Sequence, residues 1–269
     1  MEKLRQDLGS GINCLGTFCP SPLLMIPLMT SIDGPLHSPI ARTMVVIVAV
    51  PAHAERNQWM EFQRALFSQM GLASRFSYGI DASELVVSGR SDQTLKPLNC
   101  GEFESIYDTT RRINGEPMSP ENLACSWSHL LVYEQLIEDP KYDQYLVLEN
   151  DAELISPRLL VELLEHLPEN FDLAHLGTSE WYRFERVSAV NAQYWDIRKQ
   201  YFNNAHAYVL SKKGARKLLA FADGTISLPA DDLLSNAFLM TPDFDVIVPL
   251  QNPLQSGPLG AISTVDVQR

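Results

Sequence analysis

Apolar residues recur along the chain in two patterns, which predict alternating strands and helices from residue 44 onward. Short apolar runs rich in β-branched residues are typical of buried strands, and stretches with an apolar residue every three or four positions are typical of helices. The expected strands cover residues 44–50, 76–80, 145–148, 171–176, 205–210 and 243–248. The expected helices cover residues 55–71, 120–139, 157–166, 212–222 and 231–239. This order favours βαβ units, and therefore an α/β fold with a mostly parallel central sheet flanked by helices.

Three stretches lack such a period, and one of them sets the predicted domain limit. Residues 1–43 are punctuated by proline and glycine, which predicts a poorly structured N-terminal extension ahead of a single domain over residues 44–269. The abrupt change of pattern suggests the hypothesis that Met44 is the true start of the fold. Residues 84–118 read as loop around a short strand at 85–87. Residues 178–200 form a long aromatic-rich loop, and such loops are usually functional.

Composition excludes several classes of protein. The chain has 269 residues and a formal net charge of -12, which argues against nucleic acid as a partner because phosphate binding favours a basic surface. The 4 cysteines have no paired metal-ligand spacing, so we expect reduced thiols in a cytoplasmic protein. No apolar run reaches the ~20 residues that a membrane span needs. Peripheral association with a membrane stays open.

The strand expected at residues 145–148 ends on acidic residues, in the order Glu149, Asn150, Asp151. Side chains alternate between the two faces of an extended strand, so Glu149 and Asp151 are expected to point the same way, with Asn150 opposite. Two convergent carboxylates at the carboxyl end of a buried strand are a place for a hard divalent cation that also contacts a substrate's phosphates. The alternative is a polar strand end whose carboxylates cap the next helix.

Four segments together resemble a known family. They are LACSWSH at residues 123–129, LVLENDA at 146–152, AHAYVLSKKGA at 205–215 and LPADDLL at 228–234. In order and spacing they resemble glycosyltransferase family 25, which includes lipooligosaccharide and collagen galactosyltransferases. The run Val46–Pro51, followed by Arg56, is similar to the first strand and the arginine-bearing turn of that family.

The resemblance implies a GT-A-like nucleotide-sugar-binding fold, a UDP-sugar donor, Mn²⁺ or another divalent cation, and inversion at the anomeric carbon. It implies transfer of a hexose, galactose or glucose, to a saccharide acceptor of a surface glycan such as lipooligosaccharide. The family's acidic signature falls on Glu149, Asn150 and Asp151, so Glu149 and Asp151 are the expected metal ligands. The residues expected to bind the donor are Val50, Pro51, Arg56, Ser128, His129 and Glu149. The expected catalytic bases are Asp231 and Asp232, and the aromatic residues Trp181, Tyr182 and Trp195 are candidates for stacking on acceptor sugars.

Structural roles compete with several of these assignments. Asp231 and Asp232 follow Pro229 at a helix start, where an N-cap and a first-turn acid are as good an explanation as catalysis. His129 lies on an apolar face of the predicted helix, where a histidine usually packs in the core. Asn150 replaces an acid of the family, and Glu121-Asn122 replaces a glycine-glutamate pair. These two departures motivate the alternative of a catalytically silent relative that acts as a binding or scaffold module.

Overall fold

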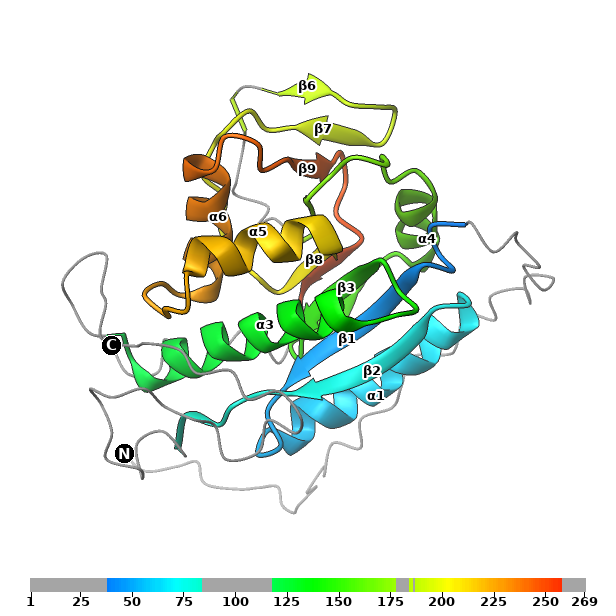
Figure 1. Cartoon of the computed structure of the whole chain (residues 1–269). Helices are drawn as coiled ribbons and strands as arrows, with labels where there is room; N and C mark the ends of the chain where they lie inside the picture. Colours follow the sequence, from blue (N-terminus) through cyan, green and yellow to red (C-terminus); the bar gives the residue numbers. More distant parts are fainter. Residues whose placement is uncertain (1–37, 84–117, 178–183, 186, 258–269) are drawn as a thin grey trace, which may run out of the picture. The chain divides into compact units, whose positions relative to one another are not determined.

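An eight-stranded sheet forms the centre of the fold (Figure 1). The computed structural model describes residues 38–83, 118–177, 184–185 and 187–257. The strands of the sheet are β1 (Thr43–Ala49), β2 (Ala73–Tyr78), β3 (Gln144–Glu149), β5 (Leu173–His175), β6 (Ser188–Ala189), β7 (Tyr194–Asp196), β8 (Ala207–Ser211) and β9 (Val246–Pro249). Their spatial order is β2-β1-β3-β8-β5-β9-β7-β6. A separate two-stranded sheet joins β4 (Ala152–Leu154) to β10 (Leu254–Ser256) in antiparallel register.

Most strands of the large sheet share one direction. Strands β2, β1 and β3 are mutually parallel, and β5 and β9 are parallel to each other. Strand β8 runs antiparallel to both β3 and β5, so β5 and β9 point the same way as β3. The edge hairpin of β7 and β6 is antiparallel, with β7 opposed to β9. The predicted α/β fold with a mostly parallel sheet is confirmed, and β8 and β7 are the two strands that oppose the common direction.

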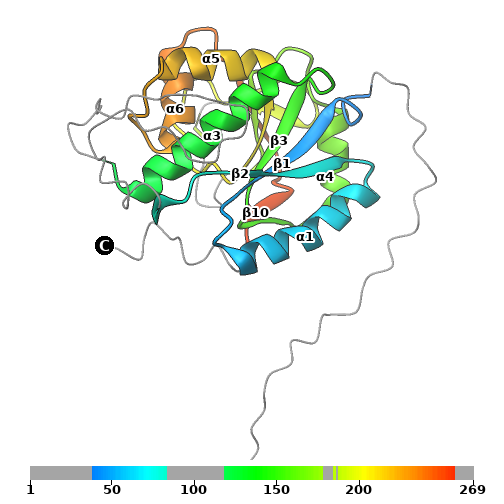
Figure 2. The ribbon, with the colours of Figure 1, turned by 60° about the horizontal axis from the view of Figure 1, so that its bottom comes forward.

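Helices cover both faces of the sheet, as Figure 2 shows for α1 and α3. One face carries α3 (Pro120–Glu138), α5 (Lys212–Ala222) and α6 (Ala230–Met240), and the other carries α1 (Ala54–Gln69) and α4 (Pro157–Glu165). Side chains of β1 alternate between the two cores, with Val46 and Val48 on the α3 side and Val45 and Ile47 on the α1 side. Because both faces are buried, the strands read in sequence as continuous apolar runs.

Local sequence signals explain where α3 and α4 begin. Ser119 and Ser156 are the N-caps, and their side chains accept hydrogen bonds from the backbone N–H groups of Asn122 and Leu159. In both helices a proline occupies the first turn, where its missing N–H would have no helical partner. Both predicted helix starts are therefore confirmed.

The structure differs from the predicted elements where strands are short. Strand β2 begins at Ala73, three residues before the expected start at 76, and ends at Tyr78, two residues before the expected end at 80. Strands β4, β6, β7 and β10 were not predicted, because segments of two or three residues show no measurable period. The short strand expected at 85–87 lies outside the described residues.

The N-terminal limit of the domain stays a prediction, although the described chain already packs before Met44. Ile40 is buried in the core, and Thr43 is the first residue of β1. All described residues fall within one compact unit, Gly34–Arg269. In the described ranges, no helix combines the length and the apolar character needed to cross a membrane.

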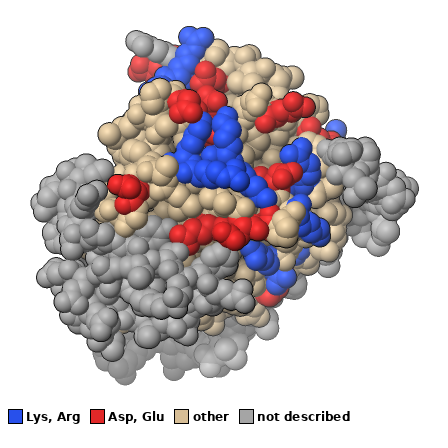
Figure 3. Space-filling view, in the orientation of Figure 1, with Lys and Arg blue, Asp and Glu red and all other residues tan. Residues whose placement is uncertain are grey.

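Basic side chains gather over α5, and acidic side chains border them (Figure 3). A buried carboxylate underlies part of this group: Asp172 is fully buried and lies 2.8 Å from the Nζ of Lys217 and 3.5 Å from the Nζ of Lys213. The backbone N–H of Asp245 also donates to Asp172, at 2.8 Å. These contacts attach α5 to the start of β5 and to the segment before β9.

Candidate functional site

A cleft of about 200 Å³ opens where β1, β2 and β3 end, against the first half of α3 and the start of α1. The carboxyl ends of parallel strands are the usual place for ligands in α/β folds. The structure brings most of the predicted site residues to this cleft, namely Val50, Arg56, Ser128, His129, Glu149 and Asp151. Pro51 does not line it and is exposed in the turn before α1.

Ser128 joins α3 to the end of β2 and so forms part of the cleft wall. Its hydroxyl donates to the carbonyl of Ala124 at 2.7 Å and accepts from the backbone N–H of Ile80 at 2.9 Å. Gly79 allows this close approach, because a Cβ at that position would lie 2.1 Å from the Ser128 Oγ. The serine therefore holds two elements together that are far apart in sequence.

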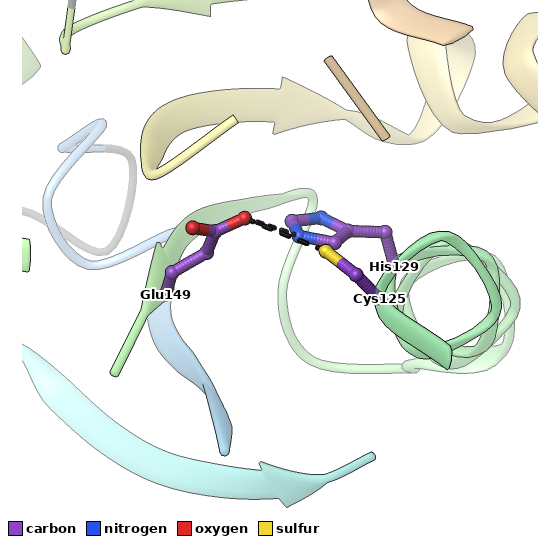
Figure 4. A group of neighbouring side chains, drawn as sticks. All are labelled: Cys125, His129 and Glu149. Atoms are coloured by element: carbon purple, nitrogen blue, oxygen red, sulfur yellow. Dashed lines mark hydrogen bonds and ion pairs between the residues drawn. The ribbon is translucent and has the colours of Figure 1, made fainter. Parts of the chain in front are cut away.

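The carboxylate of Glu149 contacts two side chains of α3 (Figure 4). Its Oε1 lies 3.2 Å from Nε2 of His129 and 3.7 Å from Sγ of Cys125. Cys125 and His129 are four residues apart, so they share one face of the helix. His129 is fully buried, whereas the Glu149 side chain keeps 27% of its surface exposed. The carboxylate thus stands at the boundary between the core and the cleft.

Burial and charge shift the pKa values of this group in opposite directions. Burial alone opposes the charged form of Glu149, but the hydrogen bond and the charge of His129, followed by His206, lower its pKa overall. Burial raises the pKa of the Cys125 thiol well above its usual value, and the charge of Glu149 adds to that shift. A neutral thiol therefore donates to a carboxylate anion.

Two buried tyrosine hydroxyls form a hydrogen-bonded network with the ring of His129. The hydroxyl of Tyr208, on β8, lies 2.7 Å from Nδ1 of His129 and 3.0 Å from the hydroxyl of Tyr133, on α3. The rings of His129 and Tyr208 also stack, with their centroids 5.9 Å apart. This network fixes the orientation of the imidazole, so its Nε2 faces Glu149.

The side chains at the end of β3 alternate in direction as far as Asn150, and Asp151 breaks the alternation. Glu149 contacts α3, and Asn150 lies on the other side, where its amide donates to Oδ1 of Asn57 on α1 at 3.1 Å. Asp151 also contacts α1, with its Oδ2 3.5 Å from Nη1 of Arg56. The prediction that Glu149 and Asp151 point the same way is wrong, because β3 ends at Glu149 and the chain turns at Asn150 and Asp151. The two carboxylates reach the cleft from different walls.

Asp151 has the properties expected of a cation ligand. Burial, and then the charge of Glu149, raise its pKa to about 6, while Arg56 opposes the shift. Its Oδ1 is buried, and no described residue donates a hydrogen bond to it. An unsatisfied buried oxygen of this kind costs roughly 1–3 kcal/mol. Carboxylate oxygens are the preferred ligands of hard divalent cations, so the buried Oδ1 of Asp151 has the chemistry to bind such an ion, and Glu149 lines the same cleft.

The predicted bases lie at the start of α6 and do not line the cleft. The hydroxyl of Tyr201 donates to Oδ1 of Asp232 at 2.7 Å, and the backbone N–H of Asp232 donates to Oδ1 of Asp231 at 3.0 Å. Burial raises the pKa of Asp231, and the charges of Asp232 and Glu149 add to the shift. Asp231 is therefore within electrostatic reach of the Glu149 carboxylate.

Other candidate residues are less closely tied to the cleft. Trp195 lies half-buried in β7, and Trp181 and Tyr182 lie outside the described residues. The cleft is also lined by polar residues that were not proposed as site residues, among them His53, Asp81 and Cys125. The spacing of four residues between Cys125 and His129 was the available signal for Cys125. His53 and Asp81 come shortly after apolar strands, a weaker signal that many surface loops share.

Comparison with known proteins gives a family match and several distant structural similarities. The profile described as glycosyltransferase family 25 (LPS biosynthesis protein) matches residues 91–234, more than half of the 269 residues.

Solved structures share little sequence with the chain. A Drosophila beta-1,4-galactosyltransferase 7 mutant, in complex with manganese, UDP-Gal and xylobiose, is 11% identical with a TM-score of 0.40. The match covers 78% of this chain and 65% of the Drosophila chain, which is less than two thirds of the latter. A mannose-1-phosphate geranyltransferase from Thermus thermophilus is 13% identical, with a TM-score of 0.41, and the match covers 80% of this chain and 74% of that one. A glycosyltransferase involved in glycosylation of the major capsid of PBCV-1 is 7% identical, with a TM-score of 0.38, and the match covers 77% and 92%.

Proposed function

This chain belongs to glycosyltransferase family 25, and from that premise we propose that it transfers galactose or glucose from a UDP-sugar to a saccharide of a surface glycan such as lipooligosaccharide. The proposed reaction inverts the anomeric carbon and depends on a divalent cation. The observation that carries the proposal is the cleft at the ends of β1, β2 and β3, which is lined by Glu149, Asp151 and Arg56. One carboxylate oxygen in it, Oδ1 of Asp151, accepts no hydrogen bond from the described part of the chain.

The proposed donor site uses both walls of the cleft. Asp151 and Glu149 would hold Mn²⁺ or another divalent cation, which supplies Lewis-acid stabilisation of the charge on the departing UDP. Arg56 stands beside Asp151, where a guanidinium can form charge-assisted hydrogen bonds with diphosphate oxygens. Ser128 forms part of the wall between β2 and α3, and Gly79 leaves room for it, so in this proposal the serine supports the donor pocket.

Asp231 is the better candidate for the base that deprotonates the acceptor hydroxyl. A general base is most effective when its pKa approaches the working pH, and burial moves the pKa of Asp231 in that direction. Asp232 is already engaged by the hydroxyl of Tyr201. The proposed acceptor therefore approaches from the α6 side of Glu149.

Calorimetric binding of UDP with and without Mn²⁺ tests the donor site. We expect binding that requires Mn²⁺ in the wild type and a loss of at least about tenfold in affinity, or roughly 1.4 kcal/mol, in Asp151→Asn. The matched control is Asp223→Asn, since Asp223 is exposed at the end of α5 with φ 48°, a left-handed conformation that asparagine also tolerates. Equal affinity in Asp151→Asn and in the control would remove Asp151 from the site, and binding that ignores the metal would point to a metal-independent transferase.

One specific observation favours a second function, that of a binding module without catalytic turnover. Asn150 stands at the family's acidic position, and its amide is committed to Asn57. A chain that binds a UDP-sugar but releases no UDP in the presence of acceptor saccharides would support this role. UDP release that is lost in Asp151→Asn and kept in Asp223→Asn would eliminate it.

A further inference from the structure

We infer that Cys125, His129 and Glu149 form a binding site for a thiophilic divalent cation, with Zn²⁺ as the best match. One ligand atom from each residue lies within 4.8 Å of the other two. A sulfur, an imidazole nitrogen and a carboxylate oxygen are ligands that zinc accepts together, whereas Mn²⁺ prefers oxygen. All three residues lie on regular elements, two on α3 and one at the end of β3.

The two distances to the Glu149 oxygen match those that a tetrahedral zinc ion imposes on its ligands. Zinc bonds of about 2.3 Å to sulfur and about 2.0 Å to nitrogen and oxygen imply ligand separations of roughly 3.5 Å for sulfur to oxygen and 3.3 Å for nitrogen to oxygen. The corresponding distances are 3.7 Å from Sγ of Cys125 to Oε1 of Glu149 and 3.2 Å from Nε2 of His129 to the same oxygen. These two separations differ from the expected values by about 0.1–0.2 Å, and the third separation, from Sγ of Cys125 to Nε2 of His129, is within 4.8 Å.

Tyr208 prepares His129 for this role. Metal-bound histidines usually donate their second ring N–H to an oxygen, which fixes both the tautomer and the ring orientation. Nδ1 of His129 lies 2.7 Å from the Tyr208 hydroxyl, which leaves Nε2 for a metal. The tyrosine hydroxyl in turn contacts Tyr133, so the ring is held by a buried network.

This thiophilic site differs from the proposed donor-cation site but shares Glu149 with it. Asp151 stands on the α1 side of the cleft, and Cys125 and His129 stand on the α3 side. Zinc on the α3 side would occupy Glu149 and keep a fourth position open toward the cleft. Binding displaces the thiol proton to solvent as the thiolate coordinates, and no electron transfer is involved. The zinc site rests on geometry alone, whereas its inhibition of donor binding rests on the proposed function.

Co²⁺ serves as a coloured probe for the site. In a chain carrying Cys14→Ser, Cys19→Ser and Cys100→Ser, Cys125 is the remaining cysteine of the 4 in the sequence. We expect this chain to show a near-ultraviolet thiolate-to-Co²⁺ charge-transfer band that stoichiometric Zn²⁺ abolishes. Adding Cys125→Ser should remove the band. Absence of the band from the chain that keeps Cys125 would overturn the assignment.

Zinc affinity, measured by competition with a chromophoric chelator, tests the supporting network without removing a ligand. Tyr208→Phe should weaken Zn²⁺ binding by about 10–100-fold while the Co²⁺ band persists, because the hydroxyl orients a ligand but is not one. The matched control is Tyr194→Phe, a buried tyrosine whose hydroxyl bonds to the carbonyl of Leu163, and its affinity should be unchanged. Equal zinc affinity in the Tyr208 and Tyr194 variants would contradict the positioning role.

The two proposals fail in distinguishable ways. Binding of zinc and cobalt is measured without nucleotide. A positive result therefore supports the zinc site even if the chain binds no UDP. If both proposals hold, Zn²⁺ should reduce Mn²⁺-dependent UDP binding in the chain that keeps Cys125. The same concentration of Zn²⁺ should reduce UDP binding less once Cys125→Ser is introduced. An equal reduction in both chains would show that the inhibitory zinc binds at another site.

Discussion

His175 makes the stability of the fold depend on pH. The residue is fully buried at the end of β5, its Nε2 donates to the carbonyl of Asn204 at 2.7 Å, and its ring packs edge-on against Phe202. Burial lowers its pKa from 6.5 to about 4, with His206 contributing in the same direction and the Asn204 hydrogen bond opposing. The imidazole is therefore neutral in the folded protein at a pH where the unfolded chain is protonated.

The size of the effect follows from proton linkage. Above the unfolded pKa of 6.5 neither state binds the proton, so His175 adds no pH dependence. Below it the unfolded chain binds a proton that the folded chain refuses, and stability falls as the pH drops toward the folded pKa of about 4. The loss is about 2 kcal/mol between about pH 7.5 and about pH 5, with an upper limit near 3.4 kcal/mol below the folded pKa.

Urea denaturation of wild type and His175→Gln at several pH values isolates this contribution. Glutamine keeps a donor near the Asn204 carbonyl but does not titrate, so the difference in unfolding free energy between the two proteins should change by about 2 kcal/mol over that range. The matched control is His166→Gln at the end of α4, which replaces an exposed histidine and so measures the effect of the same substitution outside the core. A difference between wild type and His175→Gln that stays constant across the range would refute the reasoning.

Two further predictions concern α5 and α6. Asp172→Ala should lower the unfolding free energy by about 3 kcal/mol in urea denaturation, because Lys217 then keeps, among the residues that the structure describes, only the exposed Asp243 as an acidic partner. A loss below about 1 kcal/mol, or one no larger than that of Asp223→Asn, would show that the ion pair contributes little. Asp231→Asn should lower turnover of a UDP-sugar by about 10²–10⁴-fold in an assay of UDP release, and Asp232→Asn should lower it less. The reverse order would assign the base to Asp232.

Several features of this protein are encoded locally and were therefore accessible from the sequence. The order of strands and helices follows from apolar periodicity, and the starts of α3 and α4 follow from a serine and a proline at adjacent positions. The end of β3 on acidic residues, and the four motifs that indicate glycosyltransferase family 25, are contiguous in the chain. Such signals need only neighbouring residues, because hydrogen bonding and side-chain direction within one element repeat at a fixed period.

Contacts between distant segments were decided by the tertiary structure. Strand alternation placed Glu149 and Asn150 on opposite sides, but it could not reveal that a turn sends Asp151 to Arg56 on α1. Neither the contact of Cys125 with Glu149 nor the support of His129 by Tyr208 has a local signature. The antiparallel entry of β8 between β3 and β5 brings Tyr208 to that position. The sequence by itself determined which residues end the central strand, and packing across the sheet determined which partner each of them meets, because a side chain's neighbours depend on every element that covers it.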